Sequence, residues 1–182
     1  MLDCSPVSDG ASAVILCAAD KAKKYTDKPV KIIGSGQASD MLPLHGRKDL
    51  CTFESTVYAA KNAYKQAKIE PKDIDVAEVH DCFTIAEILA IEDLGLVKKG
   101  EGGKAIDNKI TTLDGKHPVN TSGGLKAKGH PIGATGVAQI AEIAMQLRGD
   151  AEQRQVKDAK IGLTHNVGAG GASCVIHVLE AM

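Results

Sequence analysis

Residues 74–79 are a candidate strand that passes directly into His80-Asp81-Cys82-Phe83, and from there apolar residues recur with the period of a helix. Thr84 and Glu87 match the capping-box pattern T-x-x-E, which predicts that the helix begins at Thr84. Gly95 is the residue type that commonly follows the end of a helix. A buried strand that leads into a helix through a short turn is typical of α/β sheets, so this unit sets the fold class.

Other segments repeat this alternation of strands and helices. Continuous apolar runs predict further strands at residues 11–19, 30–33, 160–164 and 173–179. Helical spacing predicts helices at residues 20–25, at 54–68 and from Pro131 to Gly149. The polar, aperiodic residues 97–119 are predicted to form a loop or short strands. This order predicts an α/β sheet with parallel crossovers and an antiparallel hairpin at its carboxyl-terminal end.

The charge balance bears on the class of partner. The 182 residues include 22 Lys and Arg against 23 Asp and Glu, and the interspersed signs leave no basic face. This argues against duplex nucleic acid or an anionic membrane as the main partner. The most apolar stretch, residues 13–19, is far shorter than the roughly 20 residues that span a bilayer. Asp3 and Asp9 precede it where a signal peptide carries positive charge, so we expect a cytoplasmic protein.

The five cysteines are an odd number, and none belongs to a C-x-x-C pair. This argues against a disulfide framework and against a tetrathiolate zinc site. A zinc site made of His80, Cys82, His130 and His165 is the remaining alternative. Only His80 and Cys82 are close in sequence, so we predict no metal site.

Polar side chains stand where predicted strands and helices meet. His80 and Cys82 follow one strand, His165 and Asn166 follow another, and His130 opens a helix. Ligands of such sheets gather at the carboxyl ends of the strands. We therefore expect the chemistry at this edge of the sheet.

Cys82 lies just before the predicted helix, whose positive N-terminal end favours a thiolate. The sequence therefore predicts a lowered pKa for Cys82 and a role as nucleophile or as general acid and base. The alternative is a structural turn with a buried thiol, in which His80 bonds to the backbone.

Two glycine-rich loops offer backbone N–H groups to a ligand. The first, residues 123–136, places His130 at a helix N-terminus, where a neutral imidazole could accept a thiol proton or donate to an oxyanion. The second, residues 165–171, could form an oxyanion hole. Plain tight turns are the alternative for both loops. The first matches neither a phosphate-binding P-loop nor a dinucleotide-binding fingerprint.

Taken together, these motifs resemble those of thiolases. Residues 120–136 resemble the Gly-Gly…Gly-His-Pro signature of that family. His80-Asp81-Cys82-Phe83 is similar to the form in sterol-carrier-protein-type and archaeal thiolases, where other thiolases have Asn-Glu-Ala-Phe. His165-Asn166-Val167-Gly168 resembles their version of the final C-x-G loop, and Ser5 to Ala11 resembles the segment that leads into the last strands of the amino-terminal half.

The resemblance implies the carboxyl-terminal half of a thiolase, with a mixed five-stranded sheet and helices on both faces. Residues 1–27 would be the last strand region of the amino-terminal half, and residues 28–182 the carboxyl-terminal domain. The nucleophilic cysteine of thiolases lies in the amino-terminal half, and Cys4 and Cys17 do not have its sequence context. The resemblance therefore implies a domain that is inactive alone, needs an amino-terminal half as part of its gene or as a partner, and forms a homo-oligomer.

The resemblance also implies roles for the motif residues. His130 would activate the nucleophile and help hold the thioester oxygen. His80 would take the place of the Asn whose water completes that oxyanion hole. Cys82 would move the proton at the α-carbon of the acetyl group, and Gly168 would give an N–H to a second oxyanion hole. Either His165 or Asn166 would fill the position of the usual terminal cysteine.

The implied reaction is Claisen condensation or thiolytic cleavage of acetoacetyl-CoA-type thioesters. Coenzyme A or acetyl-CoA would be the substrate, held in part by Ser122, Gly123 and Gly124, with no covalently bound cofactor. Two alternatives remain open from the sequence. One is a thiolase-like retro-aldolase subunit, and the other is a non-catalytic module that binds coenzyme A or scaffolds an assembly.

Overall fold

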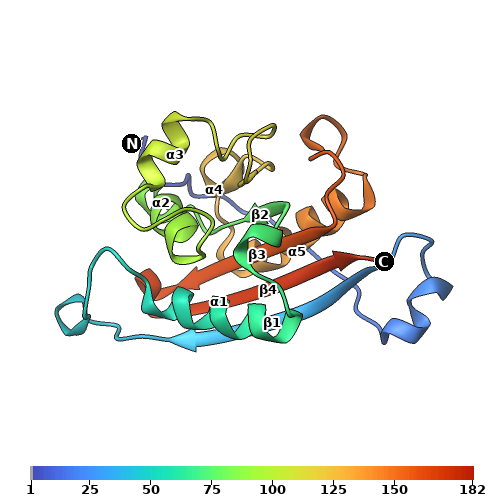
Figure 1. Ribbon diagram of the computed structural model, residues 1–182, viewed down its shortest axis with the longest axis horizontal. Helices are drawn as coiled ribbons and strands as arrows, with labels where there is room; N and C mark the ends of the chain where they lie inside the picture. Colours follow the sequence, from blue (N-terminus) through green and yellow to red (C-terminus); the bar gives the residue numbers. More distant parts are fainter. Residues whose placement is uncertain (1) are drawn as a thin grey trace.

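The computed structural model describes residues 2–182 as a sheet with helices on both of its faces (Figure 1). The strands are β1 (Val30–Ser39), β2 (Val76–Glu78), β3 (Ile161–Gly168) and β4 (Ser173–Ala181). The α-helices are α1 (Glu54–Ala67), α2 (Thr84–Asp93), α3 (Gly102–Asp107), α4 (Gly124–Lys128) and α5 (Ile132–Arg148). Short 3₁₀ turns lie at Ala19–Lys24, Leu44–Gly46, Pro71–Asp73, Glu152–Arg154 and Ala169–Gly171.

The strand order is β1-β4-β3-β2. β4 runs antiparallel to both β1 and β3, whereas β2 runs parallel to β3. The sheet is therefore mixed, and the predicted antiparallel hairpin at the carboxyl-terminal end is present as β3 and β4. Because β2 and β3 are parallel, their carboxyl ends meet at one edge, where His80 and His165 stand.

Two hydrophobic clusters hold the layers together. On one face, Cys174, Ile176 and Val178 of β4 pack in a cluster with Ala59 and Ala63 of α1. On the opposite face, the cluster includes Val76, Ile143, Leu147 and Leu179, and it joins α5 to the sheet. Gly36 lets α1 lie close to β1, because a Cβ atom at this position would overlap the carbonyl oxygen of Ala59.

The prediction of five strands is wrong, because residues 2–182 form a sheet of four strands. Val119 belongs to no strand and forms only an isolated parallel bridge with Ala77 of β2. The Ala77 N–H donates to the carbonyl of Pro118 (3.0 Å), and the Asn120 N–H donates to the carbonyl of Ala77 (2.8 Å). Pro118 has no N–H to extend the ladder, and β2 is only three residues long, so the outer strand is reduced to this bridge.

The predicted strand at residues 11–19 is also wrong. Residues 5–18 form no regular element, and the apolar side chains of Ile15 and Leu16 are exposed. An isolated strand leaves its backbone groups without ladder partners, and in residues 2–182 no strand lies beside this segment. The helix predicted at residues 20–25 is a 3₁₀ turn at Ala19–Lys24.

The helix predicted to begin at Thr84 does so, but without the predicted capping box. The Thr84 hydroxyl donates to the Asp3 carboxylate, and the Glu87 carboxylate accepts from the Asn120 side chain at 2.8 Å. Both side chains therefore fix neighbouring segments to α2. Gly95 has the positive φ (+76°) expected after a helix end, and Gly149 has the same conformation after α5.

The polar stretch of residues 97–119 is mostly turns, as predicted, but it also contains the unpredicted short helix α3. Within residues 2–182, no helix is both long enough and apolar enough to cross a membrane.

Candidate functional site

The structure brings together side chains from three separate motifs at the carboxyl edge of β2 and β3. His80 follows β2, and His130 stands just before α5. Their rings meet edge to face, with centroids 4.9 Å apart and planes at 89°. The His80 backbone N–H also points to Nδ1 of His165, at 3.4 Å. The predicted convergence of these motifs is therefore a feature of the fold.

His165 and Asn166, neighbours on β3, point to opposite faces of the sheet. His165 is fully buried on the α1 side, where its Nε2 lies 2.9 Å from the Thr56 hydroxyl. Asn166 faces α5, because a Cβ atom at Gly136 would overlap its amide. Only Asn166 therefore shares a face of the sheet with α5 and the loop that leads into it.

The His165 ring is held by a chain of hydrogen bonds. Its Nδ1 accepts from the His80 backbone, which places the ring proton on Nε2 and lets it donate to the Thr56 hydroxyl. That hydroxyl donates in turn to the sulfur of Cys174 at 3.6 Å. Burial, with the nearby His80, lowers the pKa of His165 to about 3. His165 is therefore a neutral, buried side chain that connects α1 to the segment after β2.

His80 is also held neutral near physiological pH. Its side chain is buried, and Nδ1 has no hydrogen-bond partner in residues 2–182. Burial, helped by His130, lowers the pKa of His80 to about 4, and the neighbouring amide of Asn166 acts in the opposite direction. A neutral imidazole with an unused nitrogen can donate to, or accept from, a water or a substrate oxygen.

His130 is oriented by the first turn of α5. Its Nδ1 lies 2.7 Å from the hydroxyl of buried Thr135, and that hydroxyl donates to the carbonyl of Pro131 at 3.2 Å. Since Thr135 uses its only proton on Pro131, it accepts from the Nδ1–H of His130. In the neutral ring this leaves the lone pair on Nε2, which is the arrangement of a general base.

The predicted lowering of the Cys82 pKa is wrong. Burial is the largest influence, and together with the negative charge of Asp81 it raises the pKa of this half-buried thiol above its ordinary value. A hydrogen bond from the Phe83 backbone opposes the shift without reversing it. Cys82 is therefore protonated near neutral pH, which suits a thiol that donates a proton to a reacting carbon.

The predicted ligand-binding residues Ser122 and Gly123 lie in the turn before α4, and Gly124 is the first residue of that helix. Ser122 donates its hydroxyl proton to buried Glu78 at 2.6 Å and accepts from Lys128 at 2.7 Å. Gly124 packs so closely on Asp81 that a Cβ atom there would overlap the carboxylate. This turn is thus held from beneath, whereas Gly123 is exposed.

The other predicted oxyanion-hole residue, Gly168, ends β3 at the surface. A Cβ atom there would meet nothing within 4 Å, so the space beside it is open. No group of three His, Cys, Asp or Glu residues among residues 2–182 could hold a metal ion.

Comparison with known proteins identifies the family to which this chain belongs. The sequence matches the family described as thiolase C-terminal domain-like over residues 36–181. The chain belongs to this thiolase family. The domain is 58% identical over 180 residues to a Methanothermobacter thermautotrophicus protein named acetyl-CoA acetyltransferase, an alignment that covers 99% of this chain and 47% of that protein.

Two further relatives widen the comparison. Sterol carrier protein 2 of Oryctolagus cuniculus is 44% identical over 180 residues, which cover 96% of this chain and 33% of that protein. Among solved structures, the thiolase domain is similar to one named Ltp2-ChsH2(DUF35) aldolase, with a TM-score of 0.78, 25% identity, and coverage of 90% of this chain and 42% of that one. The thiolase domain thus spans half or less of the length of these proteins.

Sequence reasoning missed two buried carboxylates of the thiolase domain that support the site. Asp81, 2% exposed, accepts the backbone N–H groups of Leu125 (2.7 Å) and Lys126 (3.2 Å) and so anchors α4. Glu78, 1% exposed, accepts from both the backbone and the hydroxyl of Ser122, with the Lys128 ammonium 3.6 Å away. The signal in the sequence was a glutamate inside an apolar strand, which is rarely buried without partners.

A polar layer on α5 was also missed. Gln139, Glu142 and Gln146 recur at intervals of three and four, which places them on one helix face, and all three are buried. Arg154 pairs with Glu142 through two hydrogen bonds of 3.2 Å, and Gln146 donates to the Thr121 hydroxyl at 3.0 Å. The layer ties α5 to the glycine-rich turn.

We expect Glu78→Ala to lower the free energy of unfolding by about 1–3 kcal/mol, because it leaves the N–H and the hydroxyl of half-buried Ser122 without their acceptor. Glu78→Gln keeps an acceptor for Ser122 and should lose less. Urea unfolding of the purified chain measures both effects. Glu101→Ala is the control, since it breaks an exposed ion pair with Lys104 and should change stability by less than about 1 kcal/mol. Equal effects of Glu78→Ala and Glu101→Ala would contradict the anchoring role.

Proposed function

We propose that this chain is the carboxyl-terminal domain of an acetyl-CoA acetyltransferase that condenses or thiolytically cleaves acetoacetyl-CoA-type thioesters. The observation that carries the proposal is the contact between His80 and His130, in which His130 presents Nε2 as a base next to a neutral His80. This pair supplies a proton acceptor and a polar group for a thioester oxygen, which are two needs of acyl transfer to a thiol.

In the proposed cleavage, a cysteine of the amino-terminal half is the nucleophile. Its thiol gives a proton to His130, and the thiolate attacks the 3-keto carbon of acetoacetyl-CoA. The bond between C2 and C3 then breaks, which leaves an acetyl-enzyme and the enolate of acetyl-CoA. Cys82 donates its proton to C2 of that enolate, and the raised pKa of Cys82 keeps this proton available. Free coenzyme A then takes the acetyl group as a second acetyl-CoA.

Of the two neighbours His165 and Asn166, we propose that Asn166 belongs to the catalytic site. It shares the α5 face of the sheet, and its amide acts on the pKa of His80, whereas His165 is enclosed on the other face. We therefore assign the terminal-cysteine position of thiolases to Asn166 and a structural role to His165. Gly168 would offer its N–H to a second oxyanion hole. Ser122, Gly123 and Gly124 would contact the coenzyme A substrate.

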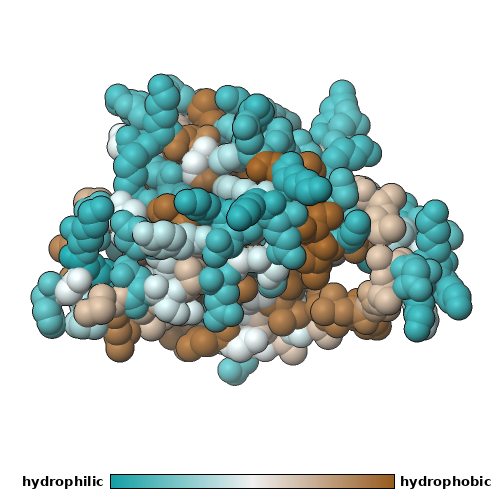
Figure 2. Space-filling view, turned by 60° about the horizontal axis from the view of Figure 1, so that its bottom comes forward, coloured by the Kyte–Doolittle hydropathy of each residue, from teal (hydrophilic) through white to brown (hydrophobic). Residues whose placement is uncertain are grey.

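The apolar surface supports a need for an amino-terminal half. On α5, the apolar side chains of Val137, Ala141 and Ala144 are only half-buried, and Ile132 at the start of the helix is 83% exposed. Figure 2 shows hydrophobic side chains gathered along the lower part and right side of one face. A second layer placed on these residues would cover them, so we also propose a larger homo-oligomeric assembly of the two halves.

The test is reconstitution. The purified 182-residue chain alone should not cleave acetoacetyl-CoA in the presence of coenzyme A, because the proposed nucleophile belongs to the other half. Co-expression with the amino-terminal half of the Methanothermobacter relative should restore cleavage, followed by the loss of acetoacetyl-CoA absorbance. Cleavage by the chain alone would refute the division of roles, and an assembled but inactive complex would refute the acyltransferase function.

A retro-aldolase is the second candidate, and the likeness to the Ltp2-ChsH2(DUF35) aldolase structure favours it. An aldolase needs no acyl-enzyme. Its activity would therefore survive without free coenzyme A and without an acyl-accepting cysteine in the partner half. A non-catalytic module would show itself differently, since turnover of the complex would then be unaffected by alanine at His130.

A further inference from the structure

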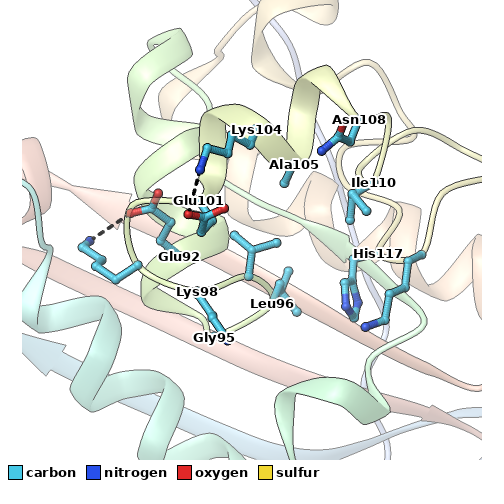
Figure 3. A pocket seen from close by; sticks show the side chains of 13 residues that line it. Glu92, Gly95, Leu96, Lys98, Glu101, Lys104, Ala105, Asn108, Ile110 and His117 are labelled. Atoms are coloured by element: carbon cyan, nitrogen blue, oxygen red, sulfur yellow. Dashed lines mark hydrogen bonds and ion pairs between the residues drawn. The ribbon is translucent and has the colours of Figure 1, made fainter.

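A pocket lies away from the histidine site, beyond the carboxyl-terminal end of α2. It has a volume of about 660 Å³, which is in the range of small-molecule sites. Its side chains come from the end of α2, from α3 and from the loops on either side of α3 (Figure 3). α2 begins beside Phe83 and runs for ten residues, so about 15 Å of helix lies between Cys82 and this pocket.

Some of the lysines that line the pocket are paired with carboxylates, and others are not. Four lysines line it, at positions 98, 99, 104 and 116, against two glutamates, Glu92 and Glu101. Glu92 is already bound by the Gly102 N–H (2.8 Å) and the Lys99 ammonium (3.5 Å), and Glu101 pairs with Lys104 at 3.1 Å. Within residues 2–182, Lys98 and Lys116 form no ion pair. Lys99 also lies 2.6 Å from the Asp93 carboxylate, so Lys98 and Lys116 are the two lining lysines without a paired carboxylate among the described residues.

The wall between these lysines is apolar and holds one histidine. Leu96 and Ala105 are buried there, and Ile110 is partly buried. His117 is only 6% exposed, and its Nδ1 has no hydrogen-bond partner among the described residues. This nitrogen is enclosed by protein and not open to the pocket, so His117 contributes the surface of its ring to the wall.

We propose that this pocket binds a small organic phosphate. Its phosphate would lie between Lys98 and Lys116, and its body against Leu96, Ile110 and the ring of His117. A phosphate monoester carries close to two negative charges at neutral pH, which matches the two lysines that have no paired carboxylate. Lysine ammonium groups bind such groups as point charges, and the apolar wall suits a nucleoside-sized body.

Calorimetric titration of the 182-residue chain with adenosine 5′-monophosphate tests the proposal. We expect saturable one-to-one binding, a shift of the His117 ring resonances in NMR spectra, and weaker binding as salt is raised. The double variant Lys98→Gln/Lys116→Gln should weaken binding about tenfold or more. The matched control Lys23→Gln/Lys24→Gln removes the same charge from the exposed 3₁₀ turn and should leave binding within about twofold.

The comparison ligands decide the chemistry. Adenosine should bind at least about tenfold more weakly than its phosphate if the lysines hold that group. Equal binding of adenosine, equal binding of inorganic phosphate, an equal loss in the control variant, or no binding at all would each overturn the proposal. Coenzyme A serves as competitor. Displacement of the nucleotide would assign the pocket to the nucleotide end of the coenzyme, and no displacement would assign it to a free nucleotide.

Discussion

Replacement of Cys82 by alanine should lower the turnover of acetoacetyl-CoA by the reconstituted enzyme about 10²- to 10⁴-fold, the range of positioned general acids and bases. The thiol is half-buried, and its raised pKa keeps it protonated near neutral pH. In the proposed reaction this thiol is the proton donor to the enolate carbon. Alanine removes that proton and leaves the fold nearly unchanged, because only one atom is lost from a half-buried side chain.

Three comparisons sharpen this experiment. Cys82→Ser keeps a proton of lower acidity and should fall between the wild type and Cys82→Ala. The control Cys51→Ala removes an exposed thiol and should leave turnover within about twofold. Circular dichroism and the assembly with the amino-terminal half check that each variant is folded. Turnover of Cys82→Ala within about tenfold of the wild type would show that the proton comes from elsewhere.

The local units were predictable because their signals are local. The spacing of apolar residues located α1, α2 and α5, and glycines fixed the ends of α2 and α5 with their positive φ angles. The edge at which His80 and His130 meet followed from where the predicted strands and helices end and begin. The strand predicted at residues 11–19 failed for a non-local reason, since a strand exists only where a neighbour offers ladder partners. Residues 11–18 have the composition of a strand and no partner in residues 2–182.

The pKa values of the site residues were harder to predict from the sequence than which residues form the site. The sequence placed Cys82 before a helix, and the helix end alone would favour its thiolate. Burial and the adjacent Asp81 outweigh that effect. The sequence shows that Asp81 is next to Cys82, but it does not show how deeply the thiol is buried. The choice between His165 and Asn166 likewise needed the sheet, because adjacent residues of a strand face opposite sides. In the sequence, the only sign of the role of Glu78 was that a glutamate stands within a candidate strand.

Acidification should destabilise this domain more steeply than its exposed histidines could explain. Burial lowers the pKa of His80 to about 4 and that of His165 to about 3, against about 6.5 for an exposed histidine. Below about pH 6.5 the unfolded chain therefore takes up protons that the folded chain does not. The free energy of unfolding then falls with pH, by about 1.4 kcal/mol per unit for each histidine, down to the folded-state pKa.

The contribution of His165 can be separated from that of the carboxylates by substitution. His165→Gln keeps an uncharged polar group at this buried position and removes its titration. In urea unfolding between pH 6.5 and 4.5, it should therefore lose stability less steeply than the wild type. The difference should approach about 1.4 kcal/mol per pH unit, although the variant starts from lower stability at pH 7 because the contacts with Thr56 and His80 are disturbed. His45→Gln alters an exposed histidine and should leave the slope unchanged. Equal slopes for the wild type and His165→Gln would mean that His165 takes up its proton in the folded state, which its enclosed position between Thr56 and the His80 backbone opposes.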